Sequence, residues 1–73
     1  MGTKISVPLG AYVIAYNDTG ATQNYGNRVT GDKLRPSYIP GSYPYFDTFT
    51  VTDTFECKGF CRIRSTGLWQ RVS

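Results

Sequence analysis

The stretch that decides the fold is FTVTDTFEC-KG-FCRIR, residues 49–64, in which two alternating segments flank a glycine turn. Side chains of a β-strand point to opposite faces with a period of two. The odd positions therefore predict one apolar face, made of Phe49, Val51, Phe55, Cys57, Cys61 and Ile63. The even positions hold three threonines, Glu56, Arg62 and Arg64, and predict a polar face. The pattern indicates a β-hairpin with one buried side.

The rest of the chain has the composition of strands and turns, with eight Gly, four Pro and many Thr, Tyr and Val. We expect strands at residues 10–16, 28–30, 45–57, 60–64 and 68–72, with turns at 17–20, 31–32 and 65–67. Residues 33–44 contain prolines 36, 40 and 44, which favour a rigid extended loop. Several short antiparallel strands in residues 1–73 predict a single all-β domain, either a small antiparallel barrel or an orthogonal sandwich.

A chain of 73 residues has a thin core, and such domains are commonly stabilised by a disulfide, a metal or a second subunit. The sequence has two Cys and no His, whereas structural zinc sites use four such ligands, so we expect no metal and no cofactor. Cys57 and Cys61 face each other if residues 58–60 form a three-residue loop, and lie diagonally if the turn is 58–59. We interpret both as small apolar residues of the buried face rather than as a disulfide.

The inventory of reactive side chains argues against catalysis. No His is present to act as a base at neutral pH, and the five acidic residues are scattered. The alternation places Asp53 with the apolar face, but we expect a hairpin edge or a bulge to leave it solvated, because buried carboxylates are rare. Cys57 and Cys61 are not followed by the helix that lowers the thiol pKa in redox motifs. The sequence therefore predicts a protein that is not an enzyme.

Binding is better supported by residues 38–46, which hold four aromatic rings braced by proline. Tyrosine presents a flat apolar face and a polar edge, which suits sugars, peptides and bases. Phe46 is assigned with equal weight to the binding surface and to the core, as the start of a strand. Trp69 is predicted to lie in the core or at its rim. Tyr12, Tyr16 and Tyr25 either extend the binding surface or pack in the core with their hydroxyls at its rim. The predicted ligand-binding residues are Tyr38, Tyr43, Tyr45, Arg35, Tyr16 and Tyr25.

The formal charge of +3 is mild and suits an anionic partner such as a cell-wall polymer or a nucleic acid. Arginine side chains pair with carboxylate or phosphate, although for any single one of them ordinary solvation is the favoured explanation. The first residues lack the pattern of a signal peptide, and no stretch is apolar enough to span a membrane. We therefore expect synthesis in a cytoplasm without a signal peptide, and no membrane partner.

Three stretches together resemble a known family: LRPSY at residues 34–38, YFDTF at 45–49, and residues 55–63 followed by LWQRV at 68–72. They resemble bacterial Src-homology-3-type domains, and more narrowly the small cell-wall-binding modules of bacteriophage endolysins that act on Gram-positive hosts, enterococci in particular. The resemblance covers about the last forty residues. The arginine loop is shorter than the family pattern and lacks its spaced glycine, which affects the ligand more than the fold.

The resemblance implies a module that binds peptidoglycan or wall carbohydrate and tethers the catalytic domain of an endolysin. It also implies a homo-oligomer, because some modules of this kind are translated separately and assemble, and it implies action at the bacterial cell wall. Two alternatives remain open at this point. One is a β-barrel that binds single-stranded nucleic acid through basic residues interleaved with aromatic ones. The other is a protein-interaction or assembly module.

Overall fold

The structure, a computed structural model, describes residues 3–37 and 47–73. In these ranges the chain forms seven strands and one 3-10 turn: β1 (Lys4–Ile5), β2 (Tyr12–Asn17), β3 (Arg28–Thr30), η1 (Gly31–Lys33), β4 (Leu34–Pro36), β5 (Thr48–Phe49), β6 (Thr54–Gly59) and β7 (Thr66–Arg71). No α-helix occurs within the described ranges. The predicted all-β class is confirmed.

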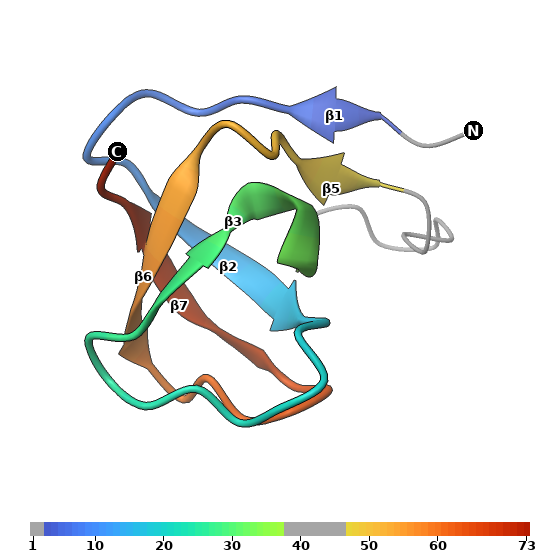
Figure 1. The fold of residues 1–73 in the computed structure, drawn as a ribbon, viewed down its shortest axis with the longest axis vertical. Coiled ribbons are helices and arrows are strands. Elements are labelled where there is room, and N and C mark those ends of the chain that lie inside the picture. The colour runs from blue at the N-terminus through green and yellow to red at the C-terminus, as the bar shows by residue number, and fades with distance from the viewer. Residues whose placement is uncertain (1–2, 38–46) are drawn as a thin grey trace.

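Five of the strands form one antiparallel sheet in the order β3-β6-β7-β2-β4, and β1 pairs with β5 in parallel. The outermost strands β3 and β4 are joined directly by the three residues of η1. A flat sheet of this order would hold its edges about 19 Å apart, at about 4.8 Å per strand. Four Cα–Cα steps span about 14 Å at most. The sheet therefore has to curl into the half-barrel seen in Figure 1, with β1 and β5 above it.

Gly31 marks the place where η1 packs against β5 and the turn that follows it. A Cβ atom at this position would lie 2.3 Å from the Thr50 carbonyl oxygen and 2.9 Å from the Phe49 Cβ. The Gly31 amide donates to the Asp53 carbonyl oxygen at 2.8 Å. Only glycine permits this approach, so the predicted turn at residues 31–32 lies at a crowded contact between the sheet edges and the β5–β6 turn.

The core lies inside the curl of the sheet and consists of Ala15, Leu34, Phe49, Phe55, Cys57, Cys61 and Trp69. The rings of Phe49 and Phe55 are tilted against each other with centroids 4.9 Å apart. The core position of Trp69 confirms the prediction made for it. Val51 and Ile63, which the alternation also placed on the buried face, are instead 57% and 37% exposed. Each lies in a turn, where the period of two no longer applies.

The predicted hairpin of residues 49–64 is wrong in its pairing. The chain turns after β5, where the Asp53 amide donates to the Thr50 carbonyl oxygen at 3.1 Å. As a result β5 pairs with β1, and β6 pairs with β3 and β7. Residues 60–64 form no strand, and the turn predicted at 65–67 lies earlier, closed by a bond from the Ser65 amide to the Arg62 carbonyl oxygen. Residues 34–36 are extended, as expected, but they form β4 against β2.

Asp53 is buried, with 3% of its surface exposed, so the prediction that it is solvated is wrong. Its carboxylate lies 3.2 Å from the Arg71 guanidinium. It also accepts hydrogen bonds from the hydroxyls of Ser6 at 3.2 Å and Thr50 at 3.1 Å. A buried charge is tolerated when it is paired and hydrogen-bonded in this way. The same arginine donates to the Val7 carbonyl oxygen at 2.7 Å, so this cluster ties both ends of the chain to the β5–β6 turn.

Candidate binding surface

The outer face of β2 carries large side chains that point away from the core. Tyr12 and Ile14 are 60% and 53% exposed, and Tyr16 follows on the same side of the strand with partial exposure. Their neighbours Val13 and Ala15 face inward, so the alternation of this strand separates small inward residues from large outward ones. We call Tyr12, Ile14 and Tyr16 the tyrosine face.

The residues predicted from sequence are placed unevenly with respect to this face. Tyr16 and Arg35 are direct cross-strand partners in the pairing of β2 with β4, so the structure brings these two together. Tyr25 is 73% exposed but lies in the β2–β3 connection, where the neighbouring Gly26 amide donates to the Cys57 carbonyl oxygen. Tyr38, Tyr43 and Tyr45 lie outside the described residues. Tyr12, for which the sequence left surface and core both open, lies on the surface, and Ile14 was not predicted as a binding residue although the same alternation applies to it.

An open groove of about 580 Å³ adjoins the tyrosine face. Its lining comes from β1, β2 and β5 and the segments next to them: Ile5, Val7, Tyr12, Val13, Ile14, Ser37 and Phe49. Among the described residues of this lining, the serine hydroxyl and the tyrosine hydroxyl are the side-chain polar groups. A groove of this kind suits an apolar face of a ligand, oriented by a few hydrogen bonds.

Arg35 is held in place by an ion pair. Its Nε and Nη2 atoms both donate to one carboxylate oxygen of Asp18, at 2.9 and 2.7 Å. Asp18 lies just after β2, and its own amide donates to the Lys33 carbonyl oxygen. The pair is partly solvated, so we expect it to contribute at most about 1 kcal/mol to stability. It fixes the orientation of the guanidinium beside Tyr16.

A second group of charges lies on the outer face of β6. The Lys58 ammonium is 2.6 Å from one Glu56 carboxylate oxygen, and the Arg28 Nε atom is 3.2 Å from the other. The hydrogen bond from Lys58, followed by that from Arg28, lowers the pKa of Glu56 below its usual value. The hydrogen bond to Glu56 likewise raises the pKa of Lys58. The ammonium also lies 5.6 Å from the centroid of the Tyr25 ring, a distance typical of a cation–π contact.

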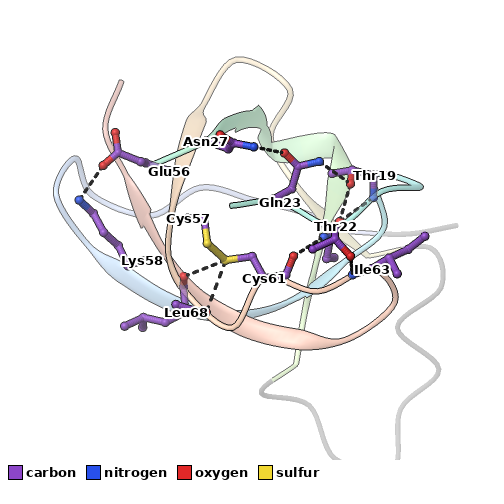
Figure 2. The surroundings of a disulfide bond; sticks show 12 residues. Thr19, Thr22, Gln23, Asn27, Glu56, Cys57, Lys58, Cys61, Ile63 and Leu68 are labelled. Atoms are coloured by element: carbon purple, nitrogen blue, oxygen red, sulfur yellow. Dashed lines mark hydrogen bonds and ion pairs between the residues drawn. A yellow bond between two sulfur atoms is a disulfide. The ribbon is translucent and has the colours of Figure 1, made fainter. Parts of the chain in front are cut away.

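The β6–β7 connection, residues 60–65, is closed at its start by a disulfide between Cys57 and Cys61. The interpretation of these residues as free thiols is therefore wrong. Their Cα atoms are 6.2 Å apart, within the range a disulfide can bridge, because the chain bends back after β6 instead of continuing as a hairpin strand. Figure 2 shows the disulfide between the Glu56–Lys58 pair on one side and polar side chains of the β2–β3 connection on the other.

Two residues of this connection have an unusual backbone. Phe60 and Arg64 have φ angles of 56° and 52°, and no other non-glycine residue in the described ranges has a positive φ. For an L-residue this conformation costs about 1–2 kcal/mol. Phe60 is also 86% exposed, so packing of its ring does not compensate for that cost. The sequence analysis did not single out Phe60, although its even position in the alternation of residues 49–64 is that of the polar face.

The β2–β3 connection holds the β6–β7 connection firmly in place. Buried Asn17 donates from its side-chain amide to the carbonyl oxygens of Ala21 and Cys61, both at 3.0 Å. The backbone amide of Gln23 donates to the Cys61 carbonyl oxygen at 2.8 Å, and the backbone amide of Ile63 donates to the Thr22 hydroxyl at 3.1 Å. Backbone strain persists where surrounding bonds determine the conformation, and it is concentrated at functional sites. The connection is thus a fixed loop that presents an aromatic ring.

Comparisons with known proteins identify no relative of this chain. No protein-family pattern, no curated protein and no solved structure matches it. Within residues 3–37 and 47–73, no helix has the length and apolarity needed to cross a membrane. The same part of the chain contains no group of three acidic, Cys or His side chains that could hold a metal ion. The chain is thus a small all-β domain with a curled antiparallel half-barrel, and its function has to be argued from its surface.

Proposed function

We propose that this chain is a non-catalytic binding module that attaches a bacteriophage lytic enzyme to the wall of Gram-positive bacteria. The observation that carries the proposal is the tyrosine face, where exposed Tyr12 and Ile14 and half-buried Tyr16 lie on one side of a single strand. Rings held on a rigid sheet lose little entropy on binding and can stack on the apolar faces of sugar rings. The adjoining groove and the fixed guanidinium of Arg35 supply further contacts.

The resemblance to bacterial Src-homology-3-type wall-binding modules supports the same proposed function. Under this proposal the partners are a wall polymer, the catalytic domain of an endolysin and other copies of this chain. Several copies would raise the affinity through avidity. A nucleic-acid ligand has less support, because the formal charge is only +3 and four of the eight basic residues form ion pairs with carboxylates of the same chain.

Binding of a fluorescent-protein fusion to Gram-positive cells and to purified sacculi tests the proposal. The wild-type fusion should sediment with the walls. The double variant Tyr12→Ala, Tyr16→Ala should lose about tenfold or more in affinity, because two stacking rings are removed. Val51→Ala, which truncates an exposed apolar residue in the β5–β6 turn, is the matched control and should bind like the wild type. Absence of wild-type binding to every wall tried would overturn the proposal.

A further inference from the structure

The charge of this chain is concentrated in its last part. Residues 57–73 contain four basic residues and no Asp or Glu, a formal charge of +4. Residues 1–56 contain four basic and five acidic residues, a formal charge of −1. The C-terminal part therefore accounts for all of the net positive charge of the chain. Its basic residues are Lys58, Arg62, Arg64 and Arg71.

Two of these four charges are already neutralised by neighbours, and two are not. Lys58 is paired with Glu56, and Arg71 with buried Asp53. Arg62 and Arg64 are exposed, and neither forms an ion pair with a residue in the part of the chain that the structure describes. Both lie in the β6–β7 connection, on the two sides of Ile63. This connection therefore offers two guanidinium groups to an external anion.

The backbone that carries these two arginines is held in place by the fold. The turn is closed by the bond from the Ser65 amide to the Arg62 carbonyl oxygen at 3.1 Å. The Arg64 amide donates to the Asn17 carbonyl oxygen, also at 3.1 Å. Arg64 occupies a positive-φ position at which glycine would be unstrained, so an arginine there is explained better by its charge than by local stability. Phe60 in the same connection projects its ring into solvent.

We infer that the β6–β7 connection is a binding site for a phosphate-bearing, anionic wall glycan, an inference that rests on the proposed function. A guanidinium group matches phosphate oxygens through paired hydrogen bonds. The exposed ring of Phe60 gives an apolar platform for the sugar between two phosphates. Because the disulfide and the backbone hydrogen bonds hold the loop before the ligand binds, its backbone loses little conformational entropy on binding. The repeating anion of such a polymer complements the +4 charge of this part of the chain.

Sacculi with and without their phosphodiester-linked polymers, removed by hydrofluoric acid, provide the test. The wild-type fusion should bind untreated walls about tenfold or more tightly than treated walls, with an affinity that falls as salt is raised. The double variant Arg62→Gln, Arg64→Gly should lose this preference. It should also unfold at an equal or higher denaturant concentration, because glycine relieves the strain at position 64. Lys33→Gln, an exposed charge removed from η1, is the matched control and should keep the preference.

The outcomes separate this inference from the proposed function. Equal wild-type binding to treated and untreated walls would overturn the inference and leave the wall-binding function standing. Absence of binding to both kinds of wall would overturn the function, and the inference with it. If Lys33→Gln lost the preference for untreated walls, net charge alone would decide binding, and the assignment of the site to the β6–β7 connection would be overturned. Tighter binding to phosphatidylglycerol vesicles or to single-stranded DNA than to the wall polymer would also overturn it.

Discussion

The two ends of β6 are held in place in different ways. Before the strand, buried Asp53 joins nearby Thr50 to Ser6 and Arg71, which come from the two ends of the sequence. At the other end, a disulfide joins Cys57 within the strand to Cys61 just after it, only four residues apart. The first arrangement holds distant segments together, whereas the second shapes one loop. We therefore expect the first to govern stability and the second to govern what the loop presents.

Removal of the Asp53 charge should have the largest effect on stability. Asp53→Asn leaves the Arg71 guanidinium, which is mostly buried, without its counter-charge, and we expect a loss of about 3 kcal/mol. The loss in the free energy of unfolding can be measured by urea denaturation, with tryptophan fluorescence as the signal, since Trp69 is the only tryptophan and lies in the core. Asp18→Asn, which breaks the partly solvated pair with Arg35, should cost less than about 1 kcal/mol. Equal losses of unfolding free energy in Asp53→Asn and Asp18→Asn would contradict the distinction between the buried pair and the solvated pair.

Removal of the disulfide should have an intermediate effect. Closing a ring of five residues restricts the unfolded chain by about 2 kcal/mol in the chain-entropy description. Cys57→Ala with Cys61→Ala should lose about that amount in the same denaturation experiment, with an unchanged β-type circular-dichroism spectrum. A loss as large as that of Asp53→Asn would mean that the disulfide, too, holds the fold as a whole. The comparison of the two ends of β6 would then fail.

The ion pair of Glu56 with Lys58, on the outer face of β6 itself, should have the smallest effect. The folded state lowers the pKa of Glu56, so its contribution to stability is present above the unfolded pKa and is lost as the pH falls through the folded value. The folded state raises the pKa of Lys58, whose contribution is lost only as the pH rises through that raised value. In an NMR titration, Lys58→Met should move the Glu56 pKa upward. If the Glu56 pKa did not move in Lys58→Met, the lowering of that pKa would have to come from Arg28 instead.

The sequence predicted the parts of the fold that depend on local alternation. Phe49, Phe55 and Cys57 face the core as expected because each lies in an extended stretch. The prediction failed at Val51 and Ile63, because the turns there are fixed by the contacts of Asp53 and by the disulfide. Local periodicity shows which side of a strand a residue is on, but it does not show where the strand ends.

The candidate surface was predictable to a similar degree. Tyr16 was identified from its type and its place in a strand, and the same alternation leads to Tyr12 and Ile14. The neighbouring position of Arg35 depends on the pairing of β2 with β4, which brings together residues 19 positions apart. Phe60 has an even position in the alternation of residues 49–64, which is the position of the polar face. Its positive φ could not be found in this way, because nothing in a phenylalanine predicts that conformation.

Composition and alternation alone determined that this chain is all-β, that aromatic rings fill its core, and that it contains no histidine. The tertiary structure alone decided the order of the strands, the bond between the two cysteines and the burial of Asp53. The physical reason is that strand pairing and ion pairing join groups far apart in the chain, such as Asp53 and Arg71, and that the bend which brings the two cysteines together is fixed by such contacts. Such contacts leave no periodic trace in a single sequence.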